Sequence, residues 1–328
     1  MVLLAGCASG NKLTESTATV TSYTGPPVAL RRAVGAIDAN VSSDSRAVGI
    51  AENGQAQSSL GNFSDDKSTD PLAYFNTRRA ELGLPPIILD SGVAAAAAAH
   101  ARYVIRHGET GHTEQAGKLG FTGVDVADRL RIRLPVSGAS EVLTRYGGSY
   151  SDGDAIRELF ASPYHRGVIL FDWQLGGAAL QRADASVIVV DFANIRPTLA
   201  PNELVAYPYD GQRGVPNAWT DNEVPDPLGD NSRYRGQRVG FPITLSGGPN
   251  AHIAWRRATL TDASGRVVTC QIAPLRPADN ARNTAICTPM EPLQAHTLYR
   301  VNAVGVLTQL SRFTTIAPFS LQWTFTTA

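Results

Sequence analysis

Two histidines and one glutamate are the residues of this chain best suited to carry out chemistry. They are His112, Glu141 and His165, and they lie in three separate segments, with Ser162 three positions before the second histidine. Imidazole titrates near neutral pH and is the commonest metal ligand, and a carboxylate between two imidazoles can fix their tautomers or raise their pKa values. Residues typical of element ends flank each of the three, so the fold can bring them to one cleft.

Two kinds of chemistry are open to such a cleft. Three protein ligands with one open position suit Zn²⁺, with His112 and His165 as the metal ligands, and a zinc-bound water would make the protein a hydrolase. The chain has no compact His-Glu-x-x-His motif, so the spacing alone does not decide. Each residue also has a structural alternative. His165 can brace a helix end, Glu141 can accept a buried hydrogen bond, and His112 can lie in a surface loop.

The other polar residues of this region are expected to serve structure. His100 and His107, seven apart on one helix, are predicted to be packing and rim residues. Arg166 is predicted to pin a loop, and Glu158 to lie on an exposed helix face. Glycine-rich phosphate loops and Gly-x-Ser-x-Gly elbows are absent from the sequence, so nucleotide binding and serine-hydrolase chemistry have no support.

Helices come first and strands later in the segment that must position these residues. Asp70-Pro71 predicts the start of a helix that Gly83 ends. Helical spacing follows over 91–107, 124–133 and 152–160, and extended runs over 140–146, 175–180 and 186–193. This order predicts an α+β domain over residues 68–196, with an antiparallel sheet.

The second half of the chain is expected to contain only strands. Residues 197–237 are rich in proline and are predicted to form a linker. Short extended runs with frequent turns over 238–328 then predict a small all-β sandwich of the Ig-like kind. Cys270 and Cys287 lie in this domain, seventeen positions apart. In an exported protein they are expected to form a disulfide worth roughly 3 kcal/mol, the alternative being two buried free thiols.

The N-terminus suggests export. Leu4-Ala5-Gly6-Cys7 looks like the bacterial lipobox, whose cysteine becomes acylated, although an ordinary apolar N-terminus is the alternative. Residues 1–67 are then a truncated signal and a flexible tether. The chain has 29 basic and 29 acidic residues, which gives no reason to expect nucleic acid as a partner. No apolar run approaches the ~18–20 residues that span a bilayer, so a membrane is reached through a lipid at Cys7.

Residues 70–195 resemble the CAP superfamily, in its bacterial SCP-domain branch. The resemblance rests on several short motifs taken together: Asn76-Thr77-Arg78-Arg79, Leu82-Gly83-Leu84-Pro85-Pro86, His100-Ala101-Arg102-Tyr103, Asp128-Arg129-Leu130, Ser162-Pro163-Tyr164-His165-Arg166 and Gly176-Gly177. It implies an α-β-α sandwich in which His112, Glu141 and His165 line the family's cleft.

Two departures from the family pattern bear on mechanism. The family's Gly-Glu-Asn is here Ser140-Glu141-Val142, and Ser162 stands about where eukaryotic members carry a second cleft glutamate. Serine cannot replace a carboxylate as a metal ligand or general base. A mechanism that needs two histidines and two glutamates is therefore in doubt.

The sequence thus predicts an exported bacterial surface protein whose cleft binds a small ligand or lipid, a cation, or a cell-envelope or host component. A metal-assisted hydrolase is the alternative, and a structural envelope protein with a vestigial cleft is a third. Whether the chain is an enzyme, what its ligand is and how it oligomerises stay open at this level.

Overall fold

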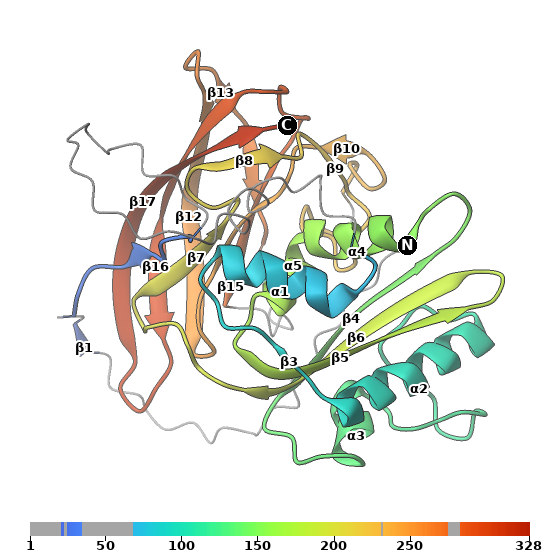
Figure 1. Cartoon of the computed structure of the whole chain (residues 1–328). Coiled ribbons are helices and arrows are strands. Elements are labelled where there is room, and N and C mark those ends of the chain that lie inside the picture. Colours follow the sequence, from blue (N-terminus) through green and yellow to red (C-terminus); the bar gives the residue numbers. More distant parts are fainter. Residues whose placement is uncertain (1–20, 23–24, 35–67, 231, 275–282) are drawn as a thin grey trace, which may run out of the picture.

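The structure is a computed structural model that describes residues 21–22, 25–34, 68–230, 232–274 and 283–328 (Figure 1). Cys7, the predicted lipidation site, lies outside these residues. We call residues 68–196 the mixed part and residues 197–328 the β part.

The mixed part contains five helices and four strands. Its elements are α1 (Pro71–Glu81), β3 (Ile88–Leu89), α2 (Ser91–His107), α3 (Val126–Arg131), β4 (Ala139–Tyr146), α4 (Asp152–Ala161), α5 (Pro163–Ile169), β5 (Trp173–Arg182) and β6 (Ser186–Ile195). The strands form one sheet in the order β3-β5-β6-β4, in which only the short β3–β5 pairing is parallel. The predicted α+β class with an antiparallel sheet is confirmed.

Helices cover both faces of this sheet (Figure 1). Val187 and Val189 of β6 pack with Ala97 and Ala101 of α2, whereas Ile188 between them belongs to the core shared with α1 and α4. Alternate side chains of a strand point to opposite faces, so β6 is buried on both sides.

Two glycines of β5 allow the layers to approach closely. A Cβ at Gly177 would lie 2.2 Å from the backbone nitrogen of Ala94 in α2, and a Cβ at Gly176 would lie 2.6 Å from Ile87. Both distances are shorter than atoms tolerate. Gly177 therefore lets the alanine-rich helix pack directly on the strand, and Gly176 leaves room for Ile87 and Leu72.

Local signals set the helix ends where the sequence places them. Asp70 accepts hydrogen bonds from the backbone nitrogens of Leu72 and Ala73, with Pro71 as the first helical residue. Gly108 ends α2 in the left-handed conformation, at φ 66°.

The segment after α4 differs from expectation. Ser162-Pro163 ends α4 as predicted, but Pro163 is also the first residue of a further helix, α5, which contains His165. Proline is well suited to a first helical position, because the N–H that it lacks would have no helical partner there. His165 is thus held on a helix and not on a loop.

The β part consists mainly of two sheets. One has the order β1-β17-β16-β12-β13 with β8 also paired to β17, and the other β14-β15-β11-β7-β2. The strands are β1 (Thr21–Ser22), β2 (Ala29–Leu30), β7 (Glu203–Tyr207), β8 (Gln212–Val215), β11 (Ile243–Ser246), β12 (Ala251–Asp262), β13 (Val267–Val268), β14 (Cys270–Ile272), β15 (Thr284–Pro289), β16 (Leu298–Gln309) and β17 (Thr315–Thr327). A separate two-stranded pair joins β9 (Trp219–Thr220) to β10 (Arg238–Val239).

Two predicted connections turn out to contain strands. Residues 197–237, expected to be a linker, supply β7 and β8 to the two sheets, and the prolines lie between these strands and not inside them. The expected tether over 1–67 supplies β1 and β2 to the same sheets. Prolines predict where strands are interrupted, but short strands can still form between one proline and the next.

The two parts share a continuous core. One buried cluster includes Phe75 and Phe160 of the mixed part together with Tyr207, Phe241 and Phe325 of the β part. A disulfide joins Cys270 in β14 to Cys287 in β15, as predicted. No helix of the described residues is long and apolar enough to cross a membrane.

Arg166 holds the two parts together. Its buried guanidinium donates to the carbonyl oxygens of Ala161 at 2.6 Å and Pro242 at 2.8 Å. The same group lies over the rings of Tyr207 and Phe241, 4.9 and 4.7 Å from their centroids. The expected pinning role is present, and it joins α5 to the β part.

Candidate functional site

Glu141 is the centre of a buried polar network on β4. Its Oε1 lies 2.7 Å from Nδ1 of His112, and its Oε2 accepts a hydrogen bond of 2.7 Å from Arg129 on α3. Arg129 also donates to the carbonyl oxygen of His112 at 3.0 Å. The carboxylate and the guanidinium are fully buried and the imidazole nearly so, with 6% of His112 exposed. The predicted His112–Glu141 pair is therefore made.

His100 extends this network into α2. Its Nδ1 lies 3.0 Å from Glu114 Oε1, and its Nε2 lies 3.1 Å from the carbonyl oxygen of Gly111 and 3.5 Å from Glu141 Oε1. Glu114 in turn accepts a 2.6 Å hydrogen bond from the backbone of Thr122. These contacts fix the loop that carries His112, which agrees with the predicted packing role of His100.

The charges of this network compensate one another. Burial opposes ionisation of Glu141, yet His100, Arg129 and His112 together hold its pKa below the ordinary value. Asp191, the cross-strand neighbour of Glu141 on β6, is also fully buried. Burial and the Glu141 charge raise the pKa of Asp191 well above its usual range, which favours its protonated form.

His165 has a different carboxylate partner. Its Nδ1 lies 2.9 Å from Oε1 of Glu223, which follows β9 in the β part. Glu223 also accepts the backbone N–H groups of His165 at 2.9 Å and Tyr164 at 3.1 Å. These are orphan donors of the first turn of α5, where Ser162 makes no side-chain cap. Glu223 thus caps α5 from 58 positions away along the chain.

The His165–Glu223 pair is neutral near pH 7. Burial, with a contribution from the nearby His112, lowers the pKa of His165 well below its ordinary value. Burial raises the pKa of Glu223 to about 8, against the effect of the two backbone hydrogen bonds. Both groups are fully buried. His112 is near enough to affect the pKa of His165, but the contact of His165 is with Glu223 and not with Glu141.

These residues do not fit a zinc site. Among the described residues, no group of three or more His, Cys, Asp or Glu side chains is arranged to hold a metal ion. Both oxygens of Glu141 are occupied, and the Arg129 charge beside it opposes a second cation. Nδ1 of each histidine is occupied as well. We therefore derive no step through a metal.

Ser162, predicted as a cleft residue, is fully buried, and its hydroxyl makes no hydrogen bond. The carboxylate beside His165 comes from Glu223. Sequence reasoning missed Glu223 and also Asp191. Asp191 could have been noticed, because it is an acidic residue within the apolar run Val187–Phe192. No feature of the sequence around Glu223 marks it as a partner of His165.

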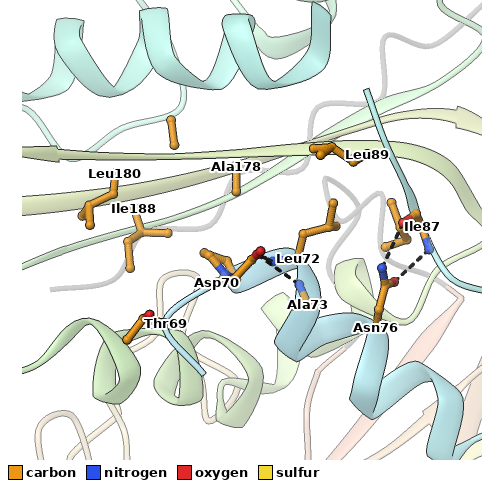
Figure 2. Close-up of a pocket in the computed structure, with 12 residues that line it drawn as sticks. Thr69, Asp70, Leu72, Ala73, Asn76, Ile87, Leu89, Ala178, Leu180 and Ile188 are labelled. Atoms are coloured by element: carbon orange, nitrogen blue, oxygen red, sulfur yellow. Dashed lines mark hydrogen bonds between the residues drawn. The ribbon is translucent and has the colours of Figure 1, made fainter. Parts of the chain in front are cut away.

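An open groove lies between α1 and the sheet (Figure 2). Its volume is about 520 Å³, within the usual range for ligand pockets. Apolar side chains make up most of its walls: Leu72, Ile87, Leu89, Ala178, Leu180 and Ile188. The figure shows Leu180 and Ile188 facing the start of α1 across this space.

Solved structures match this chain, and two of them do so at low similarity. One is an outer surface protein from Borrelia burgdorferi, with 16% identity, a TM-score of 0.33, and coverage of 38% of this chain and 90% of that chain. The other is an extracellular protein containing a SCP domain from Bacillus anthracis str. Ames, with 18% identity, a TM-score of 0.31, and coverage of 38% of this chain and 39% of that chain. No curated protein matches the sequence.

A family model gives the assignment. It describes CAP, the cysteine-rich secretory protein family, and it matches residues 72–172. This segment begins in α1, ends after α5, and includes His112, Glu141 and His165. The chain therefore carries a CAP domain of the cysteine-rich secretory protein family over residues 72–172.

Proposed function

We propose that this chain is an exported, non-enzymatic surface module that binds a small apolar ligand, such as a lipid chain, in the groove under α1. The observation that carries the proposal is the composition of this groove. Its walls are apolar, and Leu89 at the edge is 68% exposed, so a ligand would cover surface that now faces water.

Two polar side chains of the groove are engaged with the backbone. Oδ1 of Asp70 accepts from the backbone nitrogens of Leu72 and Ala73 (Figure 2). Asn76 donates to the carbonyl oxygen of Ile87 at 2.9 Å and accepts from its nitrogen at 2.8 Å. Affinity would therefore come mainly from contact with the apolar walls.

The His/Glu network is assigned a supporting role in this proposal. The contacts of Glu141 fix the loop of His112 and α3 against the edge strand β4, and Glu223 separately fixes the start of α5. A hydrolase that uses this site is disfavoured for a physical reason. A general base works best with a pKa near the working pH, whereas the pKa of Glu141 is held below its ordinary value.

Export and anchoring complete the proposal. The Cys270–Cys287 disulfide suits an oxidising compartment, and the matched family is named for secretory proteins. Cys7 would carry the lipid anchor, and the β part would act as an Ig-like module toward a cell-envelope component. Loss of membrane association in Cys7→Ser would support the anchor, and unchanged association would overturn it.

The ligand proposal can be tested with N-phenyl-1-naphthylamine, a neutral apolar fluorophore. We expect saturable binding with one site per chain. Leu89→Asp should weaken it by about tenfold or more, because it replaces exposed apolar wall with a charge. The side chain is exposed, so the substitution should leave the fold intact.

Leu119→Asp is the matched control. Leu119 is 70% exposed, much like Leu89, but does not line the groove. Equal weakening by both substitutions, or no saturable binding by the unchanged protein, would overturn the groove assignment. Peptide or ester hydrolysis that is lost in Glu141→Gln would instead favour the hydrolase.

A further inference from the structure

A second pocket lies where α4 meets the β9–β10 pair, away from the groove under α1. Its volume is about 430 Å³. The residues that matter for its chemistry are Tyr150, Arg157, Glu158, Trp219, Arg238 and Phe241. Both parts of the molecule contribute to it, so it exists only in the complete chain.

Two polar groups of this pocket lack hydrogen-bond partners. Oε1 of Glu158 is buried and makes no hydrogen bond, although the sequence predicted an exposed helix face for this residue. The indole N–H of Trp219 is also buried and has no acceptor, with 3% of the residue exposed. Trp219 and Asn222 lie near enough to Glu158 to oppose the rise of its pKa, but neither completes a hydrogen bond to Oε1. A buried acceptor and a buried donor without partners are costly, and a ligand can satisfy both.

Burial and a neighbouring carboxyl group disfavour the ionised form of Glu158. Glu223 is fully buried and near enough to Glu158 to raise its pKa, and Asp221 and Asp226 are buried next to each other. Burial, together with the neighbouring Glu223, raises the pKa of Glu158 to about 7, and burial raises the pKa of Asp221 to about 7 beside Asp226. Arg235 lies 3.9 Å from Asp226, and Arg157 is paired with Asp154 at 2.5 Å. A cationic group beside Glu158 would favour the ionised form of this carboxyl group and would be attracted to it.

We propose that this pocket binds a hydroxylated organic ammonium ion of about the size of an amino sugar. The ammonium group pairs with Glu158, and a ligand hydroxyl oxygen accepts the Trp219 N–H. Tyr150 and Trp219 supply aromatic surface, which attracts cations and covers the C–H faces of sugar rings. The proposal is independent of the apolar groove.

An inorganic cation suits the pocket less well. Calcium takes six to eight oxygen ligands. Within the described ranges, no group of three or more His, Cys, Asp or Glu side chains is placed to bind a metal. One carboxylate among aromatic walls matches an organic cation better.

Titration calorimetry with the full chain tests this proposal. The probes are D-glucosamine and D-glucose, which share a ring but differ in the ammonium group. We expect glucosamine to bind with one site per chain and glucose to bind about tenfold or more weakly. Leu89→Asp in the apolar groove should leave glucosamine binding unchanged, so the two proposals can fail separately.

Two variants locate the site. Glu158→Gln keeps the shape but removes the charge. This substitution should abolish glucosamine binding. It should also raise the midpoint temperature of thermal unfolding, because a carboxyl group whose charged form is disfavoured by burial is replaced by a neutral amide. Trp219→Phe keeps the aromatic face but removes the N–H, and it should weaken binding. Glu291→Gln, at an exposed glutamate far from the pocket in sequence, is the control and should change neither.

Several results would overturn the proposal. These are equal binding of glucose and glucosamine, no binding of glucosamine, unchanged binding in Glu158→Gln, and displacement of glucosamine by stoichiometric Ca²⁺. The thermal midpoint shows whether each variant is folded, so a loss of binding cannot be mistaken for unfolding.

Discussion

Glu141 and Asp191 show how two adjacent carboxyl groups can take opposite charge states. They face each other across β4 and β6, and both are fully buried. Arg129 and His112 contact Glu141 and favour its ionised form, whereas burial and the Glu141 charge favour the protonated form of Asp191. Like charges at this distance in a protein interior would repel strongly, so one carboxyl group is neutral.

This difference gives a prediction at the scale of single residues. Glu141→Gln leaves the Arg129 guanidinium buried without a counter-charge, which should lower the free energy of unfolding by about 3–5 kcal/mol. Asp191→Asn replaces one neutral group by another of the same shape and should cost less than about 1 kcal/mol. Urea denaturation at pH 7 measures both. Equal losses would contradict the assigned charge states.

At the scale of elements, the contact between α2 and β5 decides the thickness of the mixed part. Gly177 brings the strand backbone against the backbone of Ala94, with no side chain between them. The alanines of α2 keep the rest of the interface equally thin. This packing also fixes where the sheet lies, and β5 and β6 form one wall of the apolar groove.

Adding one methyl group should therefore separate helix and strand. We expect Gly177→Ala to lower the free energy of unfolding by about 1–3 kcal/mol, because overpacking displaces backbone atoms. Gly147→Ala is the matched control, since its Cβ would meet no atom closer than 4.0 Å. Thermal unfolding of the two variants compares them. A neutral Gly177→Ala would show that α2 can shift freely.

At the scale of the whole molecule, the two parts form one unit. Arg166 of the mixed part donates a hydrogen bond to the carbonyl oxygen of Pro242 in the β part. Glu223 of the β part caps α5, and one buried apolar cluster contains residues of both parts. The N-terminal segment adds a further tie, because Val34 donates to the carbonyl oxygen of Glu81 while β2 pairs with β7. The CAP segment is thus not a freely detachable domain in this chain.

Because Glu223 joins the two parts, its protonation predicts how the free energy of unfolding depends on pH. The pKa of Glu223 rises from an ordinary 4.5 to about 8 on folding, so the folded state keeps a proton that the unfolded state has released. Its stabilising effect is complete below pH 4.5 and is lost as the pH rises through 8. Below pH 6.5 the lowered pKa of His165 acts in the opposite direction. The interval from 6.5 to 8 therefore isolates the carboxyl groups, including Glu158 and Asp221.

Glu223→Gln should make the decline over this interval shallower by up to about 1.4 kcal/mol per pH unit, the value of one proton. Denaturation at about pH 6.5, 7.25 and 8 measures the slope. The exposed Glu291 provides the control, since Glu291→Gln should leave the slope as it is. An unchanged slope in Glu223→Gln would show that this carboxyl is already ionised in the folded protein.

The sequence predicted the mixed part well because its signals are local. A capping aspartate before a proline starts α1, and a glycine in the left-handed conformation ends α2. The motifs placed His112, Glu141 and His165 in one cleft, and the structure has a 2.7 Å contact between His112 and Glu141. The carboxylate at His165 was not predictable, because Glu223 lies 58 positions away and has no motif around it.

Proline was the misleading signal in the second half. Pro201, Pro208 and Pro216 flank β7 and β8 without interrupting them, so a proline-rich segment is part of both sheets. Glu158 was misjudged for a related reason. Within α4 its position looks polar, but its Oε1 is buried in a pocket that residues of the β9–β10 region also line. Contacts between distant segments decide such cases, and helical or strand periodicity does not contain them.

The pairing of β1 with β17 sets the reach of an anchored molecule. Cys7 and Thr21 are fourteen positions apart, and Thr21 is already part of a sheet. An extended chain covers at most about 3.5 Å per residue, so the leash from a lipid at Cys7 spans no more than about 50 Å. A protein anchored there would stand on a short stalk with its β part tied close to the bilayer, rather than drift on a tether of some sixty residues.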